Sequence, residues 1–271
     1  MQTISAARTI GGYPIFNIGN DPGLINLKTT ASSGPSDSSV PLGTADLVDI
    51  RDSNFFAAFY VQANLNVNSQ ISDWTDEPCK REDYLWKKSI GGKFKNINCV
   101  SINHVTRYWA SPTGSFQQFL VKFREMGIEV PPTIVRVEFT RFANSGTRLR
   151  YRVDINPEVF GINRDAEPIW GSNSWHKSFI KRDEKKVQFI ANLSKWAEEV
   201  QARLDNAFNK KLDAFAGMPE FSGYLRGTPP SPSNASIEDK LKAAKEFFDK
   251  NLLTEQQYNE QVKTLLNTDA K

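Results

Sequence analysis

Residues 132–158 read PTIVRVEFTRFANSGTRLRYRVDINPE, and this stretch carries the clearest secondary-structure signal in the chain. Apolar and polar residues alternate in two runs on either side of Asn144-Ser145-Gly146, a tripeptide typical of hairpin turns. Alternation with a period of two is the mark of a strand with one buried face. The stretch therefore predicts an antiparallel β-hairpin.

The charges along this stretch predict the register of the hairpin. If residues 142 and 148 pair, the numbers of every facing pair sum to 290, apolar residues meet on one side and opposite charges meet on the other. The facing pairs expected are Val137 with Val153, Phe139 with Tyr151, Glu138 with Arg152, and Arg136 with Asp154. Because opposite charges fall opposite each other without adjustment, the pattern supports this register.

Working outward, four further segments show a pattern. Residues 55–67 and 96–110 predict strands, the first with one buried face, and residues 82–89 predict a short helix. Ser115 is placed to cap a helix that ends at Gly127. Residues 182–217 predict a long amphipathic helix with this apolar stripe: Val187, Ile190, Leu193, Ala197, Val200, Leu204, Ala207 and Phe208.

These elements predict an α+β fold. We expect a mainly antiparallel sheet with the long amphipathic helix packed on it and a small C-terminal helical hairpin after it in the sequence. We divide the chain into an extended N-terminal arm over 1–45, a main domain over 46–216, a linker rich in Pro, Gly and Ser over 217–235, and a helical hairpin over 236–271.

Composition excludes several classes of protein. The 271 residues are 39% hydrophobic and 24% charged, with a net charge of +3, which is typical of a globular chain and not of a disordered or fibrous one. Apolar runs stay well short of the 18 or so residues that a spanning helix requires. The N-terminus lacks the pattern of an intact signal peptide, so we expect either a cytoplasmic protein or, if a leader has been removed, one of the periplasm or cell envelope.

The two cysteines, Cys79 and Cys99, are 20 residues apart. A single disulfide would close that loop and would point to an oxidising compartment. The alternative is two unrelated buried thiols. Two cysteines and two separated histidines do not form a metal-binding or redox motif, so we expect no metal and no cofactor.

The last segment, residues 236–267, has the pattern of two short amphipathic helices. Ser236 with Asp239 and Thr254 with Gln257 resemble capping boxes at the two helix starts. A hairpin of about 30 residues is too small to be stable alone, so we expect its apolar residues to be buried against another chain or the main domain. These docking residues are Ile237, Leu241, Phe248, Leu252, Leu253, Tyr258, Val262, Leu265 and Leu266.

This segment resembles the SHOCT family, the short C-terminal domain of many bacterial proteins. Asn251-Leu252-Leu253-Thr254-Glu255 matches the turn between the family's two helices, Tyr258 its aromatic position and Leu265-Leu266 its end, with Asn251 in place of the usual Gly. The resemblance covers about 32 residues. It implies a role in oligomerisation or localisation, without catalytic residues, and it carries no information about residues 1–216.

The candidate sites are few. His176, with Asp165 or Glu167 to orient it, is a candidate general base, and five hairpin arginines offer a basic face for nucleic acid or phosphate: Arg136, Arg141, Arg148, Arg150 and Arg152. The register above, however, pairs two of those arginines with acids, which disfavours nucleic acid as a partner. The aromatic loop over 156–179 offers a contact surface at Trp170, Trp175 and His176, or else an anchor into the core.

Glycine-rich phosphate loops, the GxSxG motif and metalloprotease motifs are missing from the sequence. The function expected from the sequence is therefore non-catalytic: a bacterial structural or assembly protein, a homo-oligomer or part of a larger assembly, that docks through its C-terminal hairpin. The alternatives are a hydrolase-like enzyme using His176 and nearby carboxylates, or a nucleic-acid binder using the arginines of 132–158.

Overall fold

A computed structural model describes residues 8–10, 13–15, 24–33, 41–51, 53–64, 77–91, 97–106, 121, 123, 125–142, 148–165, 169–208, 221–226 and 245. The helices are α1 (Glu77–Lys80), α3 (Glu184–Phe208) and α4 (Phe221–Leu225), with short 3-10 turns η1 (Pro157–Phe160) and η2 (Ile180–Arg182). The strands are β1 (Arg8–Ile10), β2 (Tyr13–Ile15), β3 (Leu24–Ser33), β4 (Pro41–Arg51), β5 (Asn54–Asn64), β6 (Trp86–Gly91), β7 (Ile97–Thr106), β8 (Thr133–Phe142) and β9 (Arg148–Ile155).

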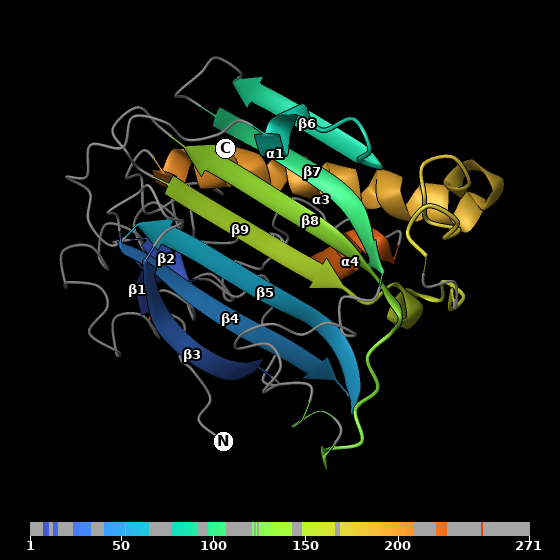
Figure 1. The fold of residues 1–271 in the computed structure, drawn as a ribbon, viewed down its shortest axis with the longest axis horizontal. Coiled ribbons are helices and arrows are strands. Elements are labelled where there is room, and N and C mark those ends of the chain that lie inside the picture. The colour runs from blue at the N-terminus through green and yellow to red at the C-terminus, as the bar shows by residue number, and fades with distance from the viewer. Residues whose placement is uncertain are drawn as a thin grey trace, which may run out of the picture. The chain divides into compact units, whose positions relative to one another are not determined.

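Seven of these strands form one antiparallel sheet in the order β3-β4-β5-β9-β8-β7-β6, and β1 pairs with β2 separately. Helix α3 lies across the β6, β7 and β8 part of the sheet on one face (Figure 1). The α+β class and the mainly antiparallel sheet with one long helix are therefore confirmed for the described residues. The chain divides into two compact units, Met1–Thr228 and Pro229–Lys271.

The predicted register of the central hairpin is confirmed. Strands β8 and β9 pair Val137 with Val153, Glu138 with Arg152 and Arg136 with Asp154. The same alternation then continues into the neighbouring strands, since β5 pairs antiparallel with β9 and β7 pairs antiparallel with β8. The hairpin at 132–158 is thus the centre of the sheet.

The face of the sheet under α3 forms the main core. Strands β5, β7, β8 and β9 contribute alternate residues that are almost fully buried, and α3 and α4 pack over them. Two large side chains join the layers: Trp196 of α3 is 0% exposed and stands edge-on to Phe139 of β8, and Phe221 of α4 stacks on Phe56 of β5. A smaller apolar cluster contains Val48, Phe55, Ala58, Phe123, Ile128 and Ile134.

Two sequence-based expectations were wrong in detail. Within 82–89, residues 86–89 belong to strand β6 and not to a helix, because Trp86 to Ser89 pair with β7. The stripe of the long helix is also rotated at its start. Val187 is 43% exposed, whereas Phe189 and Ile190 are buried. The ring contacts with Trp175 and Phe160 place Phe189 in the core.

The disulfide is confirmed: Cys79 of α1 is bonded to Cys99 of β7. It ties the start of the 77–91 segment to the sheet beside Ile97 and Phe142. The sequence left open whether these cysteines form a bond or are two separate thiols, and the structure contains the bond. A disulfide of this kind persists in oxidising compartments.

Several predicted elements correspond directly to elements of the structure. The strand expected over 96–110 is β7, the strand over 55–67 is β5, and the long helix is described as far as Phe208. In contrast, residues 24–33 and 41–45, which we assigned to an extended arm before the main domain, lie in strands β3 and β4 of the seven-stranded sheet. Among the described residues, none of the helices is long and apolar enough to cross a membrane.

Other parts of the predicted organisation fall on residues that the structure does not describe. The helical hairpin over 236–271 lies outside the described residues apart from Lys245. Of the helix expected between Ser115 and Gly127, only residues 121, 123 and 125–127 are described, and residues 121, 123 and 125 are helical. Both elements therefore stay predictions from the sequence.

Candidate functional site

The five arginines grouped by the sequence lie on two different faces of the sheet. Alternation along β8 and β9 turns Arg136, Arg148, Arg150 and Arg152 away from α3, toward one polar face. Arg141 lies instead on the helix side, where its Nε donates to Asp205 of α3 at 2.8 Å. The arginines are therefore four residues of a polar face and one residue of the helix–sheet contact.

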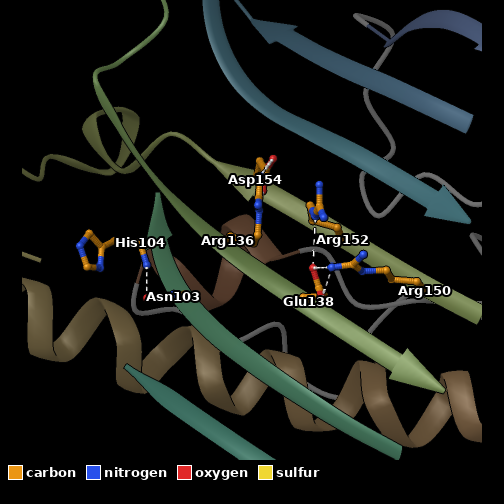
Figure 2. Close-up of polar contacts among 7 residues, drawn as sticks. All are labelled: Asn103, His104, Arg136, Glu138, Arg150, Arg152 and Asp154. Carbon is orange, nitrogen blue, oxygen red and sulfur yellow. Dashed lines mark hydrogen bonds and ion pairs between the residues drawn. The ribbon is translucent and has the colours of Figure 1, made fainter. Parts of the chain in front are cut away.

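On the polar face, most of the arginine charge is paired with carboxylates (Figure 2). Arg136 donates two hydrogen bonds to Asp154, at 2.6 and 2.8 Å, and the Asp154 side chain is only 3% exposed. Glu138 accepts from Arg150 at 2.8 Å and from Arg152 at 3.3 Å. Bidentate pairs of this kind fix side-chain geometry, so this part of the face is held in place.

Aromatic rings lie beside two of these guanidinium groups. Arg152 lies over the ring of Tyr60 at 5.0 Å, and Arg148 lies over Phe142 at 5.1 Å. Such cation–π contacts are attractive and favour a planar guanidinium over a ring face. The arrangement does not form the open stacking platform that single-stranded nucleic acid requires, because the arginines themselves pack on the rings.

The contact loop predicted at 156–179 divides its aromatic residues between the core and the surface. Trp175 is 1% exposed and packs edge-on against Phe189, so it is an anchor and is not available to a partner. Trp170 and His176 are partly exposed. They contact each other with ring centroids 4.6 Å apart.

The two histidines, which are 72 positions apart in the sequence, come together in this loop region. His104 of β7 is 1% exposed and stacks on Trp170 with ring centroids 5.2 Å apart, and His176 stands edge-on to His104 at 6.1 Å. Sequence periodicity contains no signal for this contact, because it joins a strand to a loop far along the chain. We call His104, Trp170 and His176 the histidine cluster.

The chemistry of His104 is set by its burial. Its Nε2 lies 3.2 Å from the backbone oxygen of Trp170, and its Nδ1 is buried without a hydrogen-bond partner among the described residues. Burial lowers the pKa of His104 to about 4, because a charged imidazole is poorly solvated there, and the neighbouring His176 lowers it further. The hydrogen bond with the backbone oxygen of Trp170 opposes that shift, as do the charges of Asp165 and Asp83, but burial outweighs them.

The carboxylate proposed as a partner of His176 is engaged elsewhere. Asp165 accepts hydrogen bonds from the backbone N–H of Ser174 at 2.7 Å and from the Ser174 hydroxyl. Lys186 of α3, 4% exposed, donates to that same hydroxyl and lies 3.8 Å from Asp183. These contacts join the loop to the start of α3 as an ion-pair network. Glu167, the other carboxylate considered, lies outside the described residues.

The histidine cluster predicts a specific pH dependence of stability. Since the folded state disfavours the protonated form of His104, its contribution to stability is fully present above the unfolded pKa of about 6.5 and is lost as the pH falls toward about 4. The free energy of unfolding of the wild-type chain and of His104→Phe should be measured by urea titration between those pH values. The free energy of unfolding of the wild type, relative to that of His104→Phe, should fall by about 3 kcal/mol as the pH is lowered over this range. If the difference in free energy of unfolding between the two chains does not change with pH, the lowered pKa of His104 is wrong.

Comparisons with known proteins add no family to this description. Neither a protein-family model, nor a curated protein, nor a solved structure matches the chain. Within the described residues, there is no group of three or more His, Cys, Asp and Glu side chains placed to hold a metal ion.

Proposed function

We propose that this chain is a non-catalytic bacterial assembly protein that self-associates, or docks on another protein, through its C-terminal segment. The observation that carries the proposal is the pattern of residues 236–267, in which two apolar stripes at helical spacing are too short to build a core of their own. The resemblance of that segment to the SHOCT family points the same way. The division of the chain into two compact units after Thr228 supports treating it as a separate module.

The pairing of charged groups in the described sheet supports a scaffold role for the rest of the chain. Several of the charged groups raised as catalytic or nucleic-acid-binding candidates are paired: Asp165 with Ser174, Arg136 with Asp154, and Arg150 and Arg152 with Glu138. Each of these pairs orders the sheet or its loop. A scaffold that presents an attached docking module needs such order and needs no reactive group.

The disulfide supports the proposed location in the cell envelope. A Cys79–Cys99 bond that forms in the mature protein requires an oxidising compartment. In a bacterium such a compartment is the periplasm or the outer surface. The proposal is therefore an assembly protein of the cell envelope whose sheet domain is held by one disulfide.

Changing the first apolar stripe should reduce self-association. In the full chain, Leu241→Glu introduces a charge into the stripe formed by Ile237, Leu241 and Phe248, and burying a charge without a partner is costly. We expect native mass measurement to show loss of the higher-order species. The dissociation constant of the assembly should rise at least tenfold.

Ala243→Glu is the matched control, since it adds the same charge on the opposite side of the same expected helix. It should leave the assembly unchanged. If the wild-type chain is a monomer and captures no envelope protein in a Leu241-dependent manner, the proposal is wrong. Equal loss of assembly in both variants would also contradict it.

A further inference from the structure

The aromatic loop over 156–179 is held to the sheet by contacts that do not involve a histidine. Asp165 accepts hydrogen bonds from the backbone N–H and the hydroxyl of Ser174. Asn173, which is 0% exposed, donates to Thr133 of β8 at 3.0 Å, and Trp175 is buried in the core. These contacts fix the loop at residue 165 and again from residue 173 onward.

Between these points lies a tight turn over residues 169–172, which we call the Trp170 turn. The backbone N–H groups of Ser172 and Asn173 donate to the carbonyl oxygen of Ile169, at 3.2 and 3.0 Å. The imidazole of His104, which projects from β7 (Figure 2), lies nearly parallel to the ring of Trp170. Its Nε2 is 3.2 Å from the Trp170 carbonyl oxygen. One imidazole on the sheet therefore binds both the side chain and the backbone of the turn.

The bond to Trp170 decides where a second proton on His104 would go. Because a carbonyl oxygen only accepts hydrogen bonds, the neutral imidazole carries its hydrogen on Nε2 and its lone pair on Nδ1. That Nδ1 is buried and has no hydrogen-bond partner among the described residues. A second proton would therefore lie on Nδ1 of a side chain that is 1% exposed, without a described acceptor.

The carboxylates near His104 already have other partners. Asp165 lies 4.0 Å from Lys186 of α3, in addition to its bonds within the loop. Asp83, in the segment before β6, accepts two hydrogen bonds from Arg81. Both carboxylates and the Trp170 carbonyl oxygen favour a proton on His104, but burial outweighs them and lowers its pKa to about 4.

The remaining neighbours of His104 offer no negative charge. Its facing residue on β8 is the apolar Val135. His176 stands edge-on to it at 6.1 Å and opposes its protonation. A charged imidazole stacked on the indole of Trp170 is attractive, but Nδ1 would still lack an acceptor. Moving the turn away from β7 removes this cost, because water then reaches the imidazole.

We propose that His104 is a pH-sensitive latch for the Trp170 turn: when His104 takes up a proton, residues 169–172 move away from β7 and expose the indole of Trp170. The exposed indole then lies next to Ile169, which is already 60% exposed in the closed turn, so opening enlarges an apolar surface. The base of the loop stays in place, because its contacts do not involve His104. The latch is independent of the C-terminal segment on which the proposed function rests.

The test follows Trp170 in the full chain by fluorine NMR. The six tryptophans are replaced biosynthetically by 5-fluorotryptophan, and the signal of Trp170 is identified by its loss in Trp170→Phe. Broadening by a soluble nitroxide reports how far each indole is exposed to solvent. Trp196, which is 0% exposed, is the internal reference for the packed sheet.

Between pH 7.5 and pH 4, the ratio of open to closed turn should rise on the order of 100-fold. The reason is that the open imidazole binds its proton near pH 6.5 and the closed one near pH 4. The signal of Trp170 should therefore become accessible to the nitroxide while that of Trp196 stays shielded. A Trp170 signal that is still shielded at pH 4, or that becomes accessible only together with Trp196, would overturn the proposal.

Two variants identify the group that controls the turn. His104→Phe keeps an aromatic ring beside Trp170 but takes up no proton, so its Trp170 signal should stay shielded down to pH 4. His176→Gln removes the partly exposed histidine and should keep the transition. The proposal is wrong if His104→Phe shows the same transition or if His176→Gln abolishes it. Should His104→Phe fail to fold, the comparison of Trp170 with Trp196 in the wild-type chain still decides.

Discussion

Trp196→Ala should lower the free energy of unfolding by about 3–5 kcal/mol, the usual cost of removing a fully buried large aromatic side chain. Trp196 is 0% exposed and lies where helix α3 meets the sheet. Its ring stands edge-on to Phe139 of β8 at 5.9 Å and to Phe221 of α4 at 5.8 Å. Loss of the indole leaves a cavity that three separate elements line, and none of them can close it alone.

The matched comparison is Val187→Ala on the same helix. Because Val187 is 43% exposed, its truncation should change the free energy of unfolding by no more than about 0.5 kcal/mol. Chemical denaturation followed by circular dichroism measures both variants. Similar costs for the two would mean that α3 faces the sheet through a different side, and the packing described above would be wrong.

The central hairpin could be predicted in full because its information is local. Each strand alternates polar and apolar residues, the turn tripeptide lies between them, and the pairs Glu138 with Arg152 and Arg136 with Asp154 select one register. The same register also places Arg141 opposite Leu149 on the apolar side. The separation of Arg141 from the other arginines was therefore predictable from the sequence.

Other features depend on contacts that a local pattern does not contain. Strand β6 is an edge strand of six residues whose pairing with β7 overrides the helical appearance of 82–89. The phase of α3 at its start is set by Trp175, which comes from the preceding loop and packs on Phe189. The meeting of His104 with His176 joins a strand to that same loop. Each case is a tertiary contact that outweighs a weak local preference.

Arg136→Met should lower the free energy of unfolding by about 3–5 kcal/mol, because it leaves the charge of Asp154 buried without its partner. The Asp154 side chain is 3% exposed and accepts both of its described hydrogen bonds from Arg136. Urea denaturation at pH 7 measures the loss.

Two further variants distinguish a buried ion pair from an ordinary surface one. Arg203→Met removes an arginine that binds Glu199 at 2.7 Å on α3, but both side chains are about one third or more exposed, so its cost should stay below about 1 kcal/mol. The double variant Arg136→Met, Asp154→Leu removes both buried charges beside the apolar residues Ala58 and Ile134. It should recover most of the loss, since a pair of apolar side chains at such a site is often as stable as the ion pair it replaces.

If the double variant is as unstable as Arg136→Met, the cost lies in the shape of the arginine and not in the unpaired carboxylate. In that case the pair's role would be to fill space between β8 and β9, and the charge pattern that predicted the register would be a consequence of packing.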